Sequence, residues 1–132
     1  MYSYSSNSVL IRDLVEAILV ICITLVAALF ASFAQYLFKK AMPKFRFRLP
    51  ELIALLKDRT IIAGIIIYFI GLAIYLVALE KGQLSFVYPI FASSFIFIML
   101  ISRFMLNEKL TGMRILGILL VFAGVVMISL TY

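Results

Sequence analysis

The sequence contains no histidine, no tryptophan and a single cysteine, and only 14% of its residues are charged. Without histidine it has neither imidazole metal ligands nor the commonest general base of enzymes. The one cysteine, Cys22, excludes an intrachain disulfide and says nothing about the redox compartment. A glycine-rich phosphate loop is also absent, and no carboxylate lies within the long apolar stretches, so no nucleophile–base pair is expected. These absences predict a protein that is not an enzyme and binds no metal ion or other cofactor.

Apolar residues are what the sequence has in excess. They make up 66% of the 132 residues, and the mean hydropathy of +1.21 is far above that of soluble domains. Four stretches without a charged residue are each long enough to cross a bilayer core as a helix, namely 17–38, 61–79, 82–102 and 115–132. One such helix occurs in soluble cores, but four in succession leave too little polar surface for a soluble fold.

The sequence therefore predicts an all-α integral membrane protein with four transmembrane helices in an up-down bundle. A short polar tail over 1–12 is expected to precede the bundle, and the whole chain, 1–132, is expected to form one domain. The helices are expected at about 14–40, 59–80, 83–106 and 110–131.

Lysine and arginine are distributed unevenly between the two sides of this bundle. Arg12 and Lys81 lie on one side, and ten others lie on the opposite side, in or beside the first and third connections. These ten are Lys39, Lys40, Lys44, Arg46, Arg48, Lys57, Arg59, Arg103, Lys109 and Arg114. Because cytoplasmic loops carry excess basic residues, we expect loops 1 and 3 in the cytoplasm and both termini outside, in a multi-pass protein of the inner membrane. The net charge of +6 has the same origin, so nucleic acid is not an expected partner.

The first connection alternates basic and aromatic residues over 39–50. Beside a membrane span this pattern favours anchoring to anionic head groups, so membrane lipids are expected partners. Pro50 suits the first turn of a helix. An apolar stripe follows it at Leu52, Ile53, Leu55 and Leu56. We therefore expect a short amphipathic helix over 50–57 at the membrane interface.

Polar groups interrupt the third span, where lipid does not favour them. Pro89 frees the backbone carbonyl of Ser85, and hydroxyls lie at similar depth on Tyr88, Ser93 and Ser94. This arrangement suits a helix that lines a cavity. A packing kink with serines bonded back to their own helix is an equally good explanation.

Three polar side chains in the first two spans point to the same kind of site. Tyr68 and Tyr75 lie mid-span, too deep for a head-group belt, so their hydroxyls need partners in the protein. Gln35 is the most polar side chain in any span, and it either faces protein or water or extends toward the interface near Lys39. We expect these residues to line a chamber with those of the third span.

Small residues recur at helical spacing in three of the spans. They are Ala27, Ala31 and Ala34 in the first, Gly64, Gly71 and Ala78 in the second, and Gly117 and Gly124 in the fourth. Small side chains let membrane helices approach closely. The glycine stripe of the fourth span therefore favours a helix–helix contact over a pore lining.

Several motifs together resemble the drug/metabolite transporter superfamily. They are Tyr-Pro-Ile-Phe-Ala-Ser-Ser at 88–94, Asn-Glu-Lys-Leu at 107–110, and Leu-Gly-Ile-Leu-Leu-Val-Phe-Ala-Gly-Val-Val at 116–126. The likeness covers about 20–132 and includes the tight turn at 80–82. Four-helix members of this superfamily work as dimers. The resemblance thus implies a small transporter subunit, paired with a second copy or a similar four-helix subunit, that works by alternating access.

Within this superfamily, small multidrug resistance proteins enclose their substrate between helices 1 to 3 and pair through helix 4. Carried over to this sequence, the chamber positions include Tyr68, Tyr88 and Phe91, and the dimer contact includes Gly117 and Gly124. The glutamate that defines those proteins corresponds to Ala31 here. This departure argues against proton-coupled export of cations.

The stretches 34–40 and 87–89 resemble short EamA-type transporters and the subunits of the aminoarabinose-phosphoundecaprenol flippase, which lack that glutamate. The resemblance implies flipping or export of a lipid-linked sugar or a related metabolite. A phosphate in such a substrate needs cationic partners. Candidates at the cytoplasmic face are Lys39, Lys40, Arg46 and Arg103.

Two alternatives remain open at this point. The first is a proton-coupled exporter of small organic cations, for which Glu16 and Glu80 at the outer helix ends are candidate coupling carboxylates. Solvated helix-end carboxylates are the simpler interpretation of both. The second alternative is a non-transporting membrane subunit that scaffolds a partner through its basic first loop.

Overall fold

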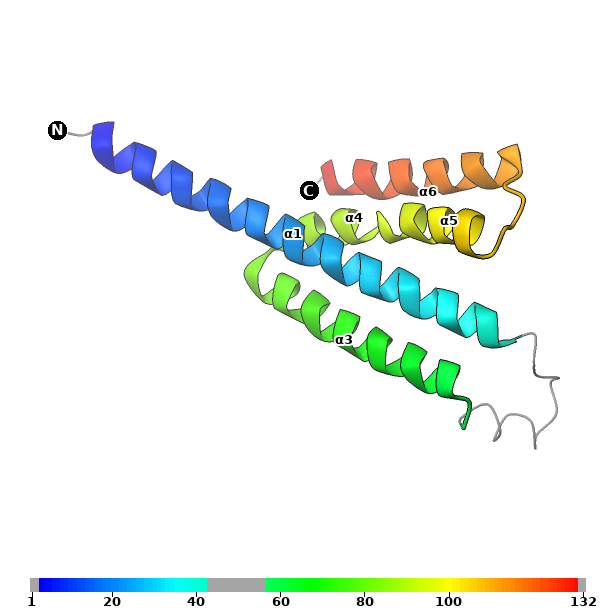
Figure 1. Cartoon of the computed structure of the whole chain (residues 1–132). Coiled ribbons are helices and arrows are strands. Elements are labelled where there is room, and N and C mark those ends of the chain that lie inside the picture. Colours follow the sequence, from blue (N-terminus) through cyan, green and yellow to red (C-terminus); the bar gives the residue numbers. More distant parts are fainter. Residues whose placement is uncertain (1–2, 43–56, 131–132) are drawn as a thin grey trace.

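The computed structural model describes residues 3–42 and 57–130, and within them every regular element is helical. The helices are α1 (Ser3–Ala41), α3 (Arg59–Lys81), α4 (Leu84–Phe91), α5 (Ser94–Met105) and α6 (Gly112–Leu130). Neighbouring segments run in opposite directions, and α4 and α5 follow each other along one line (Figure 1). The all-α up-down bundle is thus as expected from the sequence. The interfacial helix expected over 50–57 falls almost wholly outside the described residues, as does Arg46.

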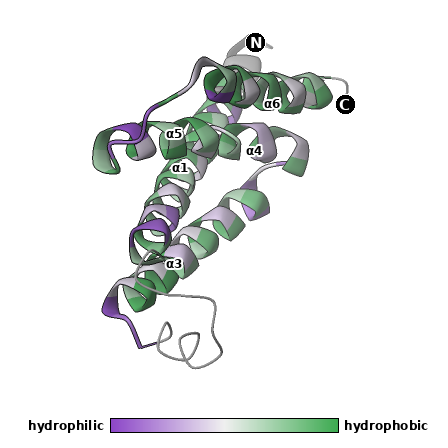
Figure 2. Cartoon of the chain, turned by 90° about the vertical axis from the view of Figure 1, so that its right-hand side faces the viewer, coloured by the Kyte–Doolittle hydropathy of each residue, from purple (hydrophilic) through white to green (hydrophobic). Residues whose placement is uncertain are grey.

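Three segments are long and apolar enough to cross a membrane: Val9–Ala41, Arg59–Lys81 and Leu84–Met105. Gly112–Ile128, within α6, is a shorter apolar helix. Hydrophobic residues run along all of these helices, and hydrophilic residues gather at the turns between them (Figure 2). Large apolar side chains are exposed on the outer faces, as expected of surfaces that meet lipid. The protein is an integral membrane protein.

Helix α1 is longer than the expected 14–40. It begins at Ser3, and its first half projects beyond the other helices (Figure 1). The polar tail expected over 1–12 is therefore helical in its described part. The reason is that neither glycine nor proline occurs in this stretch, and Val9, Leu10 and Ile11 continue the apolar run. At about 1.5 Å per residue, its 39 residues measure roughly 58 Å, about twice a hydrocarbon core.

The third span, expected as one helix over 83–106, is divided into α4 and α5. Pro89 inside α4 removes one backbone N–H from the helical ladder. Just beyond it, the N–H of Ser93 donates to the carbonyl of Ile90 at 3.1 Å, three residues back instead of four. Ala92 and Ser93 keep right-handed helical dihedral angles. The two helices therefore continue as one span with a local irregularity.

Helix α1 lies at the centre of the bundle, with α3 on one side and α4 and α5 on another (Figure 1). Small residues form its contact with α3. The buried members are Ala27, Ala31 and Ala34 of α1 and Gly64, Gly71 and Ala78 of α3. A Cβ atom at Gly71 would lie 2.9 Å from the Cβ of Phe30 and 3.4 Å from the carbonyl oxygen of Ala27. The small-residue stripes of these two helices thus form a close helix–helix contact.

Gly71→Leu should destabilise the bundle, because the new side chain must push the α1 and α3 backbones apart. Overpacking of this kind costs about 1–3 kcal/mol, or more where backbone must move. The free energy of unfolding in mild detergent, followed by loss of helical circular dichroism, measures the effect. Gly112→Leu is the matched control, because nothing lies within 4 Å of a Cβ at Gly112. Equal stability of the two variants would contradict the close α1–α3 contact.

Candidate functional site

An open groove of about 700 Å³ lies between α3, α4 and α6. Its lining is mostly apolar, with three hydroxyl groups, and consists of Tyr75, Leu79, Leu84, Ser85, Tyr88, Val125 and Ile128. The ring of Tyr75 also contacts that of Phe91, with centroids 4.4 Å apart. The structure therefore brings together Tyr75, Tyr88 and Phe91, three of the residues expected to line a chamber.

The other expected chamber residues lie elsewhere. Ser94 faces α1, where its carbonyl oxygen accepts a hydrogen bond from the hydroxyl of Ser32 at 3.2 Å. The hydroxyl of Ser93 is buried and has no hydrogen-bond partner among the described residues. Tyr68 is 43% exposed and does not line the groove, although it shares the seven-residue repeat with Tyr75. The repeat sets the side of a helix on which a residue lies. On that side of α3, Tyr75 contacts Phe91 of α4 and lines the groove, whereas Tyr68 does not line it.

A cluster of charged and polar side chains joins α1, α5 and α6 at the other end of the bundle. Its centre is Glu108, in the connection between α5 and α6. The ammonium of Lys39 forms an ion pair with one carboxylate oxygen, Oε1. The other, Oε2, accepts hydrogen bonds from Ser102 at 2.5 Å and from Arg114 at 3.2 Å. We call these four residues the Glu108 cluster.

The hydrogen-bond partners of Glu108 favour its ionised form and outweigh the opposing effect of desolvation. The hydrogen bond from Lys39 is the largest cause, followed by that from Ser102, and together with Arg114 they lower the pKa of the carboxyl from 4.5 to about 2. Arg103 adds a fourth contact by donating to the backbone oxygen of Glu108 at 3.3 Å. Glu108 is therefore a carboxylate at any physiological pH.

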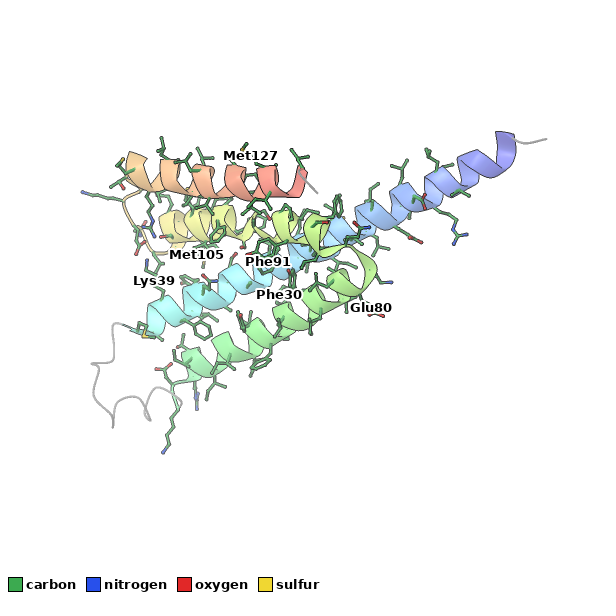
Figure 3. All side chains as sticks on the ribbon, turned by 180° about the vertical axis from the view of Figure 1, so that it is seen from behind. Phe30, Lys39, Glu80, Phe91, Met105 and Met127 are labelled. Carbon is green, nitrogen blue, oxygen red and sulfur yellow. The ribbon has the colours of Figure 1, made fainter. Side chains whose placement is uncertain are left out.

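Gln35 lies beside this cluster rather than in the groove. A small cavity of about 90 Å³ has polar and charged lining residues that include Gln35, Tyr36, Lys39, Ser102 and Arg114. Lys39 lies next to the connection that follows α5, at the end of the bundle opposite Glu80 (Figure 3). Lys40, another expected phosphate ligand, instead lies over the ring of Tyr36 at 5.8 Å.

The sequence alone did not identify Glu108, Ser102 or Arg114 as site residues. Glu108 belonged to a predicted turn, and Arg114 entered only the count of basic residues. One signal was available, because Glu108 is an acidic residue in a short connection flanked by basic helix ends. That signal does not reveal that Lys39, distant in sequence, would complete the cluster.

The two candidate coupling carboxylates have different surroundings. Glu16 lines a pocket of about 380 Å³ together with Asp13 of α1. The opposite wall includes Lys81 and Gln83 at the α3–α4 turn. Glu80 is exposed at that turn and points away from the bundle (Figure 3). Ala31, in the second half of α1, is buried against Gly71 of α3.

Gly117 and Gly124 lie on α6, and apart from chain neighbours and the adjoining α6 backbone, no described atom lies within 4 Å of where a Cβ would be. Large apolar side chains of α6 are exposed around them, including Leu116, Leu120 and Met127.

The sequence pattern of the EamA-like transporter family matches residues 1–130, almost the whole chain. The chain belongs to the EamA-like transporter family. No solved structure is significantly similar to it.

Curated relatives of this EamA-like chain are named probable 4-amino-4-deoxy-L-arabinose-phosphoundecaprenol flippase subunit ArnE. Those of Pseudomonas paraeruginosa and Pseudomonas fluorescens are each 32% identical over 60 residues, which cover 46% of this chain and 52% and 53% of the relatives. The match thus spans about half the length of these relatives. The protein of Pseudomonas savastanoi pv. phaseolicola is 27% identical over 99 residues, 75% of this chain and 87% of its own.

Replacing Glu108 in this EamA-like chain should weaken the bundle at neutral pH but not in strong acid. The folded-state pKa of about 2 lies below the ordinary 4.5, so the carboxylate contributes stability that is fully present above about pH 4.5 and lost as the pH falls toward 2. The difference in melting temperature between wild type and Glu108→Gln should therefore shrink over that range. Circular dichroism in detergent at pH 7, 5, 3 and 2 measures it.

Glu80→Gln is the control for this experiment, because Glu80 is an exposed carboxylate outside the cluster. The melting temperature of this variant should differ little from that of wild type at every pH. A Glu108→Gln difference that stays constant down to pH 2 would show that the cluster does not stabilise the bundle through the ionised carboxylate.

Proposed function

We propose that the chain is a subunit of a membrane transporter that moves a lipid-linked sugar phosphate, or a related metabolite with an apolar tail, across the bilayer. The observation that carries this proposal is the open, mostly apolar groove between α3, α4 and α6. A hydrocarbon tail is compatible with such walls, and the hydroxyls of Tyr75 and Tyr88 offer hydrogen bonds to polar groups near the head.

The curated relatives support this substrate class. Their printed names describe subunits of a flippase for an aminoarabinose linked through phosphate to undecaprenol. Such a substrate combines a long apolar tail, an anionic phosphate and a polar sugar. It needs an apolar groove and a cationic site in one protein, and this chain has the groove and the Glu108 cluster at different depths.

The distribution of basic residues supports an orientation with the Glu108 cluster at the cytoplasmic face and the α3–α4 turn outside. In this orientation the first and third connections face the cytoplasm and both ends of the chain lie outside. The substrate would then present its phosphate to Lys39 and Arg103 at the cytoplasmic face.

The surface of α6 around Gly117 and Gly124 supports a dimer contact through this helix. The partner is either a second copy or a similar four-helix subunit, consistent with the word subunit in the names of the relatives. Transport would proceed by alternating access, as the groove of each subunit opens to one side of the membrane and then to the other.

Proton-coupled export of cations has less support. A buried alanine, Ala31, occupies the position on α1 that corresponds to the glutamate of small multidrug resistance proteins, so no carboxylate is present there to exchange a proton for a cation. Glu16 lies near Lys81 in a pocket at the helix ends.

Tyr75→Phe and Tyr88→Phe should each weaken binding of a polyprenyl-phosphate sugar by about fivefold, the effect of one hydrogen bond of roughly 1 kcal/mol. Native mass spectrometry from lipid nanodiscs measures the bound fraction, and vesicle assays measure flipping of the same compound. Tyr68→Phe is the matched control, since Tyr68 lies outside the groove. Identical behaviour of all three variants would contradict a role for the groove. Failure of wild type to bind any lipid-linked sugar would contradict the substrate class.

Gly124→Leu should weaken dimerisation at least about tenfold, because a bulky side chain separates two helices that meet through small residues. The stability of the single chain should not change, because Gly124 has open space around it. Single-molecule photobleaching in liposomes measures the dimer fraction. The control is Gly112→Leu at the first residue of the same helix. A dimer fraction insensitive to Gly124→Leu would place the contact on another surface.

A further inference from the structure

Side chains from three helices converge on the carboxylate of Glu108. Lys39 comes from the last turn of α1, Ser102 from α5 and Arg114 from the start of α6. They contact both oxygens of the carboxylate, and the distances from Ser102 and Arg114 are 2.5 and 3.2 Å. Two cations and a hydroxyl arranged around two oxygens suit any oxyanion, and a phosphate group is one that such donors bind well.

The charges of this cluster do not balance within the chain. Lys39 and Arg114 supply two positive charges, and Arg103 lies close enough to donate to the backbone of Glu108 at 3.3 Å. Glu108 supplies a single negative charge. A phosphate group with one or two negative charges compensates these cations at least as well as the carboxylate does.

The cluster is accessible to a ligand. The side chains of Lys39 and Arg114 are 47% and 45% exposed, and that of Glu108 is 29% exposed. A small cavity lined by Lys39, Ser102 and Arg114 opens beside them. Glu108 is held by a connection rather than by a helix, next to Asn107 with its positive φ of 51°. The carboxylate can therefore leave its partners without unfolding a helix.

We propose that Lys39, Ser102 and Arg114 form a phosphate-binding subsite in which the carboxylate of Glu108 is an internal competitor. The phosphate of the substrate displaces Glu108, bridges α1 and α6 in its place, and frees the connection between α5 and α6. Binding at this subsite is thereby linked to a local rearrangement at one end of the bundle. That the phosphate belongs to a lipid-linked substrate rests on the proposed function, whereas the exchange of anions does not.

Equilibrium binding of two probes to the full chain tests this proposal in phosphatidylcholine nanodiscs at pH 7. The probes are undecaprenyl phosphate, measured by native mass spectrometry, and inorganic phosphate, measured by ³¹P line broadening. Glu108→Gln keeps the shape of the side chain but removes the competing charge, so the affinity for undecaprenyl phosphate should rise about tenfold or more. Arg114→Gln should lower it by a similar factor.

Lys109→Gln is the matched control, because it removes one positive charge from an exposed residue of the same connection. It should change the affinity by less than about twofold, since Lys109 is exposed and is not a member of the Glu108 cluster, and exposed charges contribute little. Equal losses in Arg114→Gln and Lys109→Gln would reduce the effect to general surface attraction and overturn the subsite. Arg114→Gln keeps the pair of Lys39 with Glu108, so it tests the proposal independently if Glu108→Gln does not fold.

The two probes distinguish the source of the phosphate. Tighter binding of undecaprenyl phosphate to Glu108→Gln supports the proposal, with or without a parallel gain for inorganic phosphate. A gain for inorganic phosphate alone would overturn the lipid-linked ligand and leave a site for free anions. No gain for either probe would overturn the competition by Glu108.

Flipping of a lipid-linked sugar by the same variants separates this proposal from the proposed function. If wild type transports the sugar and neither Glu108→Gln nor Arg114→Gln changes binding or transport, the subsite is wrong and the function stands. If the variants bind the probes as expected but wild type transports no lipid-linked sugar, the function is wrong and the phosphate subsite stands.

Discussion

The close approach of α1 and α3 is the constraint on which the other contacts of this bundle depend. Moving an apolar side chain from lipid into a protein contact gains little free energy, because lipid tails are equally apolar. Membrane helices therefore associate through close packing of small residues. Gly71 of α3 lies against the backbone of α1 at Ala27 and Ala31, where even a methyl group has no room. This contact fixes α1 along its second half. From there, Ser32 reaches the backbone of α5, and Lys39 reaches the connection that follows it.

The third span separates two different environments. On the side of α3 and α6, the irregular helix formed by α4 and α5 borders an apolar groove with phenol hydroxyls. At its far end, Ser102 joins the Glu108 cluster, where cations from α1 and α6 share one carboxylate. An amphipathic, phosphorylated substrate needs both environments. Pro89 and the shortened hydrogen-bond spacing near Ser93 lie between them, where a span that changes shape during transport benefits from a weakened helical ladder.

Much of the architecture follows from local properties of the sequence. The charge-free stretches predicted the helices, and the alanine spacing of the first span indicated that another helix could approach it closely, because both depend on short-range periodicity. Which helix makes that approach was not predicted. The start of α1 was wrong because a polar segment without helix-breaking residues continues a helix that has already formed. The third span was expected as one helix, and Pro89 explains why it is divided. The position of the break, at Ala92 and Ser93, depends on how the backbone relaxes after the proline.

The sequence by itself determined that this chain is helical and lies in a membrane, because the length and apolarity of a segment suffice to decide how it meets lipid. Only the tertiary structure decided which polar side chains act together. It separated Tyr68 from Tyr75 and joined Lys39 to Glu108, residues far apart in the chain. A helical repeat defines the side on which a residue lies, whereas its partner depends on which neighbouring helix passes at that depth.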